Sequence, residues 1–242
     1  MHIIKLNATG STNNYLKSLS QKTRLLDDTI VITENQTQGR GQLQNTWHFE
    51  PNKSLAFTVY KEFVTISAKD QFYISMAVSL GIFSAFEEFK INNLKIKWPN
   101  DIMSYQKKCC GILIETKLKG MAIGAAFVGI GVNVNNFTEI DLPQAISLQT
   151  SLGTVLNLEM VFDKILKRVL EELNNINPQT MQDILERYTD RLFKKDVVAV
   201  YQDTKGAIFN GIIKGVTKNG QLVLERDTVT ETFSLKEIKM LY

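Results

Sequence analysis

The sequence is poor in the residues that most often carry metal-based or covalent catalysis. Its 242 residues include two histidines, His2 and His48, and two cysteines, Cys109 and Cys110, which are neighbours in the chain. A histidine-based metal cluster or a serine–histidine–aspartate triad therefore has almost nothing to draw on. Adjacent cysteines do not form a structural disulfide framework, so we interpret both as free thiols in a reducing compartment.

Long apolar runs are also missing. No stretch of about 18 apolar residues could span a membrane, and the N-terminus lacks the apolar core of a signal peptide. We therefore expect a cytoplasmic protein without a membrane partner. The net charge of +3 is mild, and the lysines and arginines are scattered along the chain, so the composition does not predict nucleic-acid binding.

The patterns that are present predict two domains. A hydrophobic content of 44% and a charged content of 22% are ordinary for a globular protein. Strand-like and helix-like patterns alternate through residues 1–192, which predicts an α+β domain with a mixed sheet. From about Phe193 onward, short strands with an apolar period of two follow one another closely, with Asn219-Gly220 as a hairpin turn. We predict a small β-barrel over residues 193–242.

The segment 36–47 is the part of the chain that the rest is built to hold. It is polar and lies between two apolar runs, 29–33 and 54–60, so we interpret it as a loop between strands. Gly39 and Gly41 flank Arg40, and these glycines would allow positive φ angles and a close approach of amide N–H groups to a ligand. The loop is therefore a candidate site for an anion.

Three helix starts are predicted from capping patterns. Residues 11–16 begin with hydroxyl and amide side chains that can cap free N–H groups, and capping-box spacing occurs at 67–70 and at 180–183. Taken alone, residues 11–16 are best interpreted as a helix cap without a role in binding. Near a glycine loop, however, a capped helix N-terminus offers further donors to the same anionic ligand.

The string Lys97-Trp98-Pro99-Asn100-Asp101 ends a predicted strand in a turn. One interpretation is a buried tryptophan followed by a polar turn. The functional interpretation is that Asp101 helps to hold Mg²⁺ while Lys97 faces an anion, the pairing that nucleotide phosphates require. Lys108 follows on a predicted polar hairpin, 105–108, where a solvated surface lysine is the plain alternative.

Familiar catalytic motifs do not occur. Gly129-Ile130-Gly131 is a weak match to a dinucleotide fingerprint because the third glycine is missing, and there is no Walker A motif, nucleophile elbow or zinc-spaced cysteine set. What remains is a set of cations, amides and glycines with one carboxylate. Such a set favours catalysis by positioning and charge neutralisation over a covalent enzyme intermediate.

Taken together and in order, these motifs closely resemble those of the biotin protein ligases. They are the segments 11–13, 36–41 with Trp47, 97–101, 108–115 and 129–133. The resemblance covers essentially the whole chain, and it implies a mixed α/β catalytic domain followed by a small SH3-like barrel. It further implies that biotin and ATP form biotinyl-5′-adenylate and pyrophosphate, with Mg²⁺, before biotin passes to one lysine of a carrier protein. The expected partner is a biotin carboxyl carrier protein or the carrier domain of a biotin-dependent carboxylase.

The resemblance also assigns roles to residues. Arg40, Lys108, Lys97 and Asp101 would be catalytic, with Asp101 linked to the metal and a conceivable aid in deprotonating the acceptor lysine. The biotin side would comprise Ser11, Thr12, Asn13, Gln36, Gly39, Arg40, Gly41, Gln42, Lys108 and Gly111. The nucleotide side would comprise Arg40, Trp47, Lys97, Asn100, Lys108 and Asn133.

The sequence departs from the family pattern in three places. The ligase region begins within the first residues, without the N-terminal helix-turn-helix of many relatives, so DNA binding is not expected. Gln42 replaces a second arginine that many members carry, and Gln44 replaces a common glycine. The neutral Gln42 gives up a charge-assisted contact to the adenylate phosphate, so we hypothesise that the adenylate escapes more readily.

Two other functions stay open at this point. A lipoate or octanoate ligase or transferase shares the fold and the adenylate chemistry, although the Gly-Arg-Gly loop and the 97–101 string favour biotin. A non-catalytic biotin sensor is the second alternative, against which the retained Lys97, Asp101 and Lys108 argue. The family includes monomers and dimers, so a homodimer is also an open alternative.

Overall fold

The computed structural model describes residues 1–42, 45–136 and 143–242, and its larger part is a mixed seven-stranded sheet in the order β1-β2-β3-β7-β6-β5-β4. Strands β1 and β2 run parallel, and the other neighbours are antiparallel. The strands are β1 (His2–Leu6), β2 (Thr29–Thr33), β3 (Ser54–Glu62), β4 (Leu94–Lys97), β5 (Asp101–Ser104), β6 (Lys107–Lys119) and β7 (Ala122–Asn133). The predicted α+β class with a mixed sheet is confirmed.

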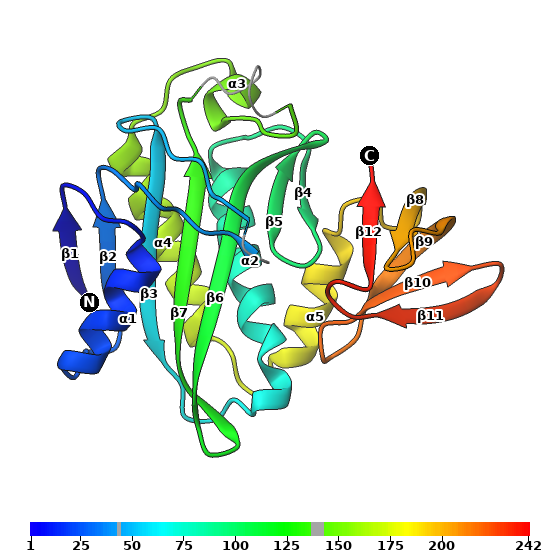
Figure 1. Cartoon of the computed structure of the whole chain (residues 1–242), viewed down its shortest axis with the longest axis horizontal. Coiled ribbons are helices and arrows are strands. Elements are labelled where there is room, and N and C mark those ends of the chain that lie inside the picture. The colour runs from blue at the N-terminus through cyan, green and yellow to red at the C-terminus, as the bar shows by residue number, and fades with distance from the viewer. Residues whose placement is uncertain (43–44, 137–142) are drawn as a thin grey trace.

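Helices cover both faces of this sheet (Figure 1). Helix α1 (Thr12–Lys22) packs on one face, where Leu16 meets Val31 and Phe127. On the other face α2 (Phe72–Glu88) is buried nearly all round, because the sheet lies on one side of it and α4 (Leu158–Asn174) on the other. The remaining helical segments are a 3₁₀ turn (Ala68–Asp70), α3 (Leu148–Leu152) and α5 (Met181–Asp190).

The capping predictions have mixed outcomes. Ser11 caps α1 by accepting from the Asn14 N–H, and Ser67 caps the 3₁₀ turn by accepting from the Lys69 N–H. The capping box predicted at 180–183 is wrong. Thr180 is itself in the helical region and makes no side-chain cap, because its hydroxyl donates to the Asn175 carbonyl within the preceding turn.

The C-terminal part is a five-stranded antiparallel sheet in the order β11-β10-β9-β8-β12. Its strands are β8 (Val198–Asp203), β9 (Ile208–Val216), β10 (Leu222–Arg226), β11 (Val229–Phe233) and β12 (Ile238–Leu241). Gly220 takes φ +84° in the turn between β9 and β10, as the hairpin prediction required. The sheet is consistent with an SH3-like barrel, and it includes β11 and β12, which the sequence patterns did not reveal.

The C-terminal sheet packs directly against the 97–101 string. The Trp98 indole N–H donates to the Gly220 carbonyl at 2.9 Å, and the Tyr188 hydroxyl donates to the Pro99 carbonyl at 3.0 Å. The Trp98–Pro99 peptide is cis. Gly220 is needed here for its size as well, since a Cβ would lie 2.3 Å from the Phe72 ring. This junction places the barrel beside the predicted nucleotide residues.

The structure bears on two expectations drawn from composition, the free cysteines and the lack of a membrane-spanning segment. Both cysteine thiols are unpaired and buried, and burial raises the pKa of each above its ordinary value. None of the described helices combines the length and apolar character needed to cross a bilayer.

Candidate functional site

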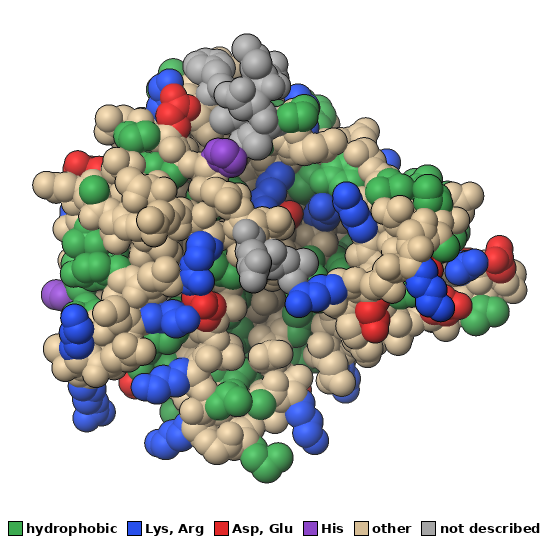
Figure 2. All heavy atoms as spheres, viewed as in Figure 1, with side chains coloured by type: hydrophobic (Ala, Val, Ile, Leu, Met, Phe, Trp, Pro, Cys, Tyr) green, Lys and Arg blue, Asp and Glu red, His purple; other side chains and the backbone are tan. Residues whose placement is uncertain are grey.

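A hollow lies where the start of α1, the 36–47 loop and strands β6 and β7 meet. A larger cleft adjoins it, between the seven-stranded sheet and the C-terminal sheet. Figure 2 shows Lys and Arg side chains gathered around the opening between the two sheets. The hollow is lined by Ser11, Thr12, Asn13, Gln36, Arg40, Gly41, Gln42, Trp47, Ala56, Asn100, Lys108, Gly111, Ile112, Leu113, Gly129 and Ile130. Most of the predicted biotin-side residues are therefore brought together.

The 36–47 loop is held to the segment before α1. The Gln36 side-chain oxygen accepts from the Thr12 N–H at 3.0 Å, and the Gln38 N–H donates to the Gly10 carbonyl at 2.8 Å. Neither Gly39 nor Gly41 takes the positive φ angle that a glycine allows. Gly39 is required for space instead, because a Cβ would lie 2.5 Å from the Trp47 carbonyl oxygen. The loop prediction itself is sound, although Gln44 lies outside the described residues.

Arg40 is paired with groups of the protein. One of its guanidinium nitrogens donates to the Asn14 side chain and lies 3.4 Å from Glu115 Oε2. Lys17 donates to the other Glu115 oxygen at 2.9 Å. Partial burial acts to raise the pKa of Glu115, but the hydrogen bonds from Lys17 and Asn13 and the nearby positive charges outweigh it and lower the pKa. Glu115 is thus an ionised counter-charge for the arginine of the loop.

Lys108 is paired in the same way with Asp101, the carboxylate that the sequence predicted for the site. Its ammonium lies 2.7 Å from Asp101 Oδ1 and 5.4 Å from the centre of the Trp47 ring. The hairpin predicted around 105–108 and the turn predicted after Lys97 are both confirmed, but Lys108 and Asp101 lie just outside the two turns. Lys108 lies in β6 and Asp101 opens β5, because the connecting turn needs only residues 105–106. Strand positions hold both side chains more firmly than loops would.

The glycines of the 129–131 segment make room for side chains. A Cβ on Gly131 would lie 2.4 Å from the Trp47 ring, and one on Gly111 would lie 3.0 Å from it. The indole therefore sits flat against the sheet, in the wall that the hollow shares with the cleft. Its N–H is buried and has no hydrogen-bond partner in the part of the chain that the structure describes.

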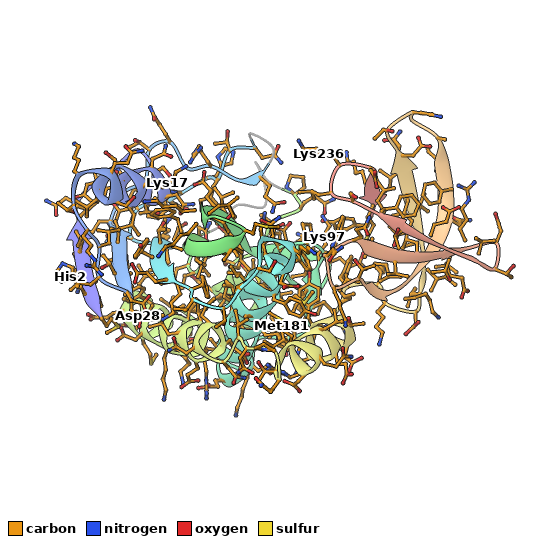
Figure 3. The ribbon with its side chains drawn as sticks, turned by 90° about the horizontal axis from the view of Figure 1, so that it is seen from below. His2, Lys17, Asp28, Lys97, Met181 and Lys236 are labelled. Carbon is orange, nitrogen blue, oxygen red and sulfur yellow. The ribbon has the colours of Figure 1, made fainter. Side chains whose placement is uncertain are left out.

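The remaining predicted nucleotide residues are placed differently. Lys97 lines the cleft, with its ammonium 4.7 Å from the centre of the Tyr242 ring, and Figure 3 shows it and Lys236 at the junction with the barrel. Asn100 is buried, and its amide donates to the Ile112 carbonyl. Asn133 is buried and accepts from the Asn136 amide at 3.1 Å, and it lines neither described cavity.

The donor set limits the kind of metal that could bind. The described residues contain no group of three or more His, Cys, Asp or Glu side chains that could hold an ion. Mg²⁺ often needs only one or two carboxylates when nucleotide phosphates supply further oxygens. Asp101, on the wall of the cleft, fits this second mode.

Several residues of the site were not predicted from the sequence. Thr58 lies beneath the hollow, and its signal was a polar side chain in the middle of the apolar run 55–60. Glu115 belongs to the 108–115 motif, but that motif assigned it no role. Lys17 lies in a predicted helix, and nothing in the sequence around it indicates a site residue. Tyr242 and Lys236 reach the cleft from the barrel, which no local pattern indicates.

Comparisons with known proteins identify relatives of this chain. The family model described as "Biotin/lipoate A/B protein ligase family" matches residues 6–135. Relatives include the bifunctional ligase/repressor BirA of Bacillus spizizenii, 27% identical over 154 residues, and that of Salmonella typhimurium, 26% identical over 246 residues. The matches cover 63% and 99% of this chain, and 46% and 74% of the two relatives. The chain thus spans less than half of the Bacillus protein.

A solved structure of similar fold is the biotin protein ligase of Aquifex aeolicus in complex with biotin and ATP. It superposes with a TM-score of 0.82 at 22% identity, covering 99% of this chain and 98% of that one. The likeness extends over both sheets, so the fold of the seven-stranded part and of the C-terminal sheet is shared.

Proposed function

Because the chain belongs to the biotin/lipoate A/B protein ligase family, we propose that it is an ATP-dependent biotin protein ligase. It would join biotin to ATP as biotinyl-5′-adenylate and then transfer biotin to a lysine of a carrier domain. The observation that carries the proposal is the pair of cations at one hollow, Arg40 and Lys108, each held by a carboxylate of the protein. The proteins with the same fold include one that binds biotin and ATP.

The chemistry explains why such cations are needed. In the first half-reaction the biotin carboxylate attacks the α-phosphorus of ATP, so one anion approaches another. Fixed cations and N–H groups that face the developing charge lower this barrier, and a single well-placed donor is worth about 3 kcal/mol. In the proposed mechanism Arg40 exchanges Glu115, and Lys108 exchanges Asp101, for the carboxylate and phosphate oxygens.

This exchange of partners has a low energetic cost. A cation that is already paired and partly desolvated gives up one anion and gains another, so it need not be stripped of bulk water when the ligand binds. The Arg40 side chain is 43% exposed and the Lys108 side chain 32% exposed, which leaves both free to turn. The two ion pairs would therefore hold Arg40 and Lys108 close to the positions from which they contact the ligands.

We propose the remaining roles on the same basis. Ser11, Thr12 and Gln36 would bind the polar ring of biotin, with Gly41 and Gly111 beside it in the lining of the hollow, while Gly39 would let the loop pack closely against Trp47. Lys97 and Trp47 would serve the nucleotide, and Asp101 would contribute to holding Mg²⁺, which supplies charge neutralisation on the phosphates. Asn13, Asn100 and Asn133 already bond within the protein, so we assign them to support of the site.

The direct test of the function is ATP–pyrophosphate exchange that depends on biotin. We expect exchange with biotin and none with lipoate or octanoate, followed by transfer of labelled biotin to a carrier domain. Exchange driven by lipoate would favour the alternative ligase. Biotin binding without exchange would favour a sensor and contradict the proposal.

The proposal includes an expectation for Gln42, which lines the hollow. A Gln42→Arg variant should release less biotinyl-adenylate than the natural chain, because the added cation forms a charge-assisted contact with the phosphate. The measurement is stray biotinylation of a non-substrate protein incubated with each enzyme, biotin and ATP. Gln179→Arg, at an exposed position just before α5, controls for the change in net charge. Equal stray labelling by all three proteins would refute the expectation.

A further inference from the structure

Helix α1 holds the carboxylate that pairs with Arg40. Glu115 lies in β6 opposite Phe127 of β7, on the sheet face that α1 covers. The Lys17 ammonium donates to Glu115 Oε1 at 2.9 Å, and the Asn13 amide donates to Oε2 at 3.1 Å. Both donors belong to the first two turns of α1, on which Figure 3 labels Lys17. Glu115 is therefore fixed by the helix independently of Arg40.

Arg40 is the more weakly held of the two cations beside Glu115. Its guanidinium nitrogen lies 3.4 Å from Glu115 Oε2, the oxygen that Asn13 also uses, whereas Lys17 binds the other oxygen at 2.9 Å. Charge-assisted N–H···O bonds are usually about 2.7–2.9 Å long, so the Lys17 contact is of normal length and the Arg40 contact is long. The second partner of Arg40 is the Asn14 side chain, which carries no charge. Of the two ion pairs, the one with Arg40 is thus the first to break.

The position of Glu115 makes a second cation necessary. Its side chain is 26% exposed, and this partial burial opposes its ionisation. The hydrogen bonds from Lys17 and Asn13 overcome that effect and lower the pKa, with a smaller contribution from Arg40. Among the described residues, the ion pairs of Glu115 are those with Lys17 and Arg40. Without Lys17, the departure of Arg40 would leave a partly buried carboxylate with no cation beside it, which is costly.

We propose that Lys17 is a positioning residue, which neutralises Glu115 permanently so that Arg40 can leave Glu115 for the ligand anions. The inference rests on the proposed function and deepens it, because it names the group that sets how readily Arg40 is released. Lys17 lines neither the hollow nor the cleft, so it acts through Glu115 and does not contact the ligand. The Asn13 amide cannot take this role, because it bonds to Glu115 without cancelling its charge.

The variant Lys17→Met tests the proposal in the exchange assay. With Lys17 gone, Glu115 depends on Arg40 alone for a counter-charge, so Arg40 leaves it less readily and biotin binds more weakly. We expect the biotin concentration at half-maximal exchange to rise about threefold to fivefold, the effect typical of a partly exposed ion pair. The exchange rate at saturating biotin and ATP should stay the same, because the ligand-bound state is unaltered. Lys17→Arg keeps the ion pair and should match the natural chain.

Two further variants separate this role from a structural one. Lys22 is exposed in the last turn of the same helix, so Lys22→Met controls for the change in net charge and should need no more biotin than the natural chain. In Lys17→Met/Glu115→Gln the carboxylate charge is removed as well, and Arg40 is released again. This double variant should therefore need less biotin for half-maximal exchange than Lys17→Met. A double variant that needs as much biotin as Lys17→Met, or more, would overturn the inference.

The outcomes distinguish failure of the inference from failure of the proposed function. A natural chain without biotin-dependent exchange would overturn the proposed function, and the inference with it. An active natural chain whose Lys17→Met variant behaves like Lys22→Met would overturn the inference alone. A Lys17→Met variant that is slow even at saturating biotin would do the same, because Lys17 would then act on the chemistry or the fold and not on the release of Arg40.

Discussion

Replacing Lys108 with methionine should lower the rate of biotin-dependent pyrophosphate exchange by about a hundredfold to a thousandfold, the loss typical of a group that stabilises developing charge. Lys108 lines both the hollow and the cleft, so its ammonium lies where the vitamin carboxylate and the α-phosphate would meet. Methionine keeps much of the apolar stem and removes the charge. Single-turnover measurement of adenylate formation would separate this loss from any change in product release.

Two controls separate catalysis from folding. Lys119→Met changes an exposed lysine of the same strand, β6, and should leave exchange unaltered. Because Lys108→Met also leaves Asp101 unpaired, its thermal stability should be compared with that of the Lys108→Met/Asp101→Asn double variant. Recovery of stability in the double variant would show that the unpaired carboxylate causes any loss of stability, while the role of Lys108 is judged from the exchange rate of the single variant, since Asp101 is itself assigned to Mg²⁺. Near-normal exchange by Lys108→Met would contradict that role.

Replacing Gly131 with alanine should reduce exchange by about a hundredfold, as expected when a catalytic loop is displaced by about 1 Å. The new methyl group would lie 2.4 Å from the Trp47 indole, a rigid ring that lies against the paired glycines Gly111 and Gly131 of β6 and β7. Trp47 also closes the 36–47 loop, because its backbone N–H donates to the Gly39 carbonyl at 3.0 Å. Moving the indole therefore moves the loop that carries Arg40.

The matched control is Gly211→Ala in β9 of the C-terminal sheet, where the nearest atom to a new Cβ is a Tyr201 ring carbon at 3.5 Å. That contact is ordinary, so both exchange and stability should be nearly unchanged. Both variants should be folded, as judged by circular dichroism and melting temperature. Full exchange by Gly131→Ala would show that the position of Trp47 is unimportant.

Much of the site could be predicted because its residues lie in short, ungapped strings. The loop at 36–47, the string at 97–101 and the cap at Ser11 each carry local signals, and the strand at 29–33 was predicted with its observed bounds. Glycines, a proline and hydroxyl caps have strong local preferences that do not depend on distant contacts. The boundary between residues 192 and 193 stays a prediction.

What could not be predicted depends on contacts between distant segments. The Arg40–Glu115 pair joins residues 75 positions apart, and the register of β6 alone decides which side of the strand Glu115 faces. The need for glycine at position 39 could not be predicted for the same reason, since it comes from the approach of Trp47 and not from a positive φ angle. A capping pattern at 180–183 was overridden by the turn before it.

The central claim is that two cations, held by carboxylates of the protein, turn to the ligands when biotin and ATP are brought together. The most direct measurement is a crystal structure with biotin and a non-hydrolysable ATP analogue bound. The account predicts that Arg40 leaves Glu115 and Lys108 leaves Asp101, and that both contact carboxylate or phosphate oxygens at hydrogen-bond distance. Ligands bound at the site with both protein ion pairs intact would contradict it.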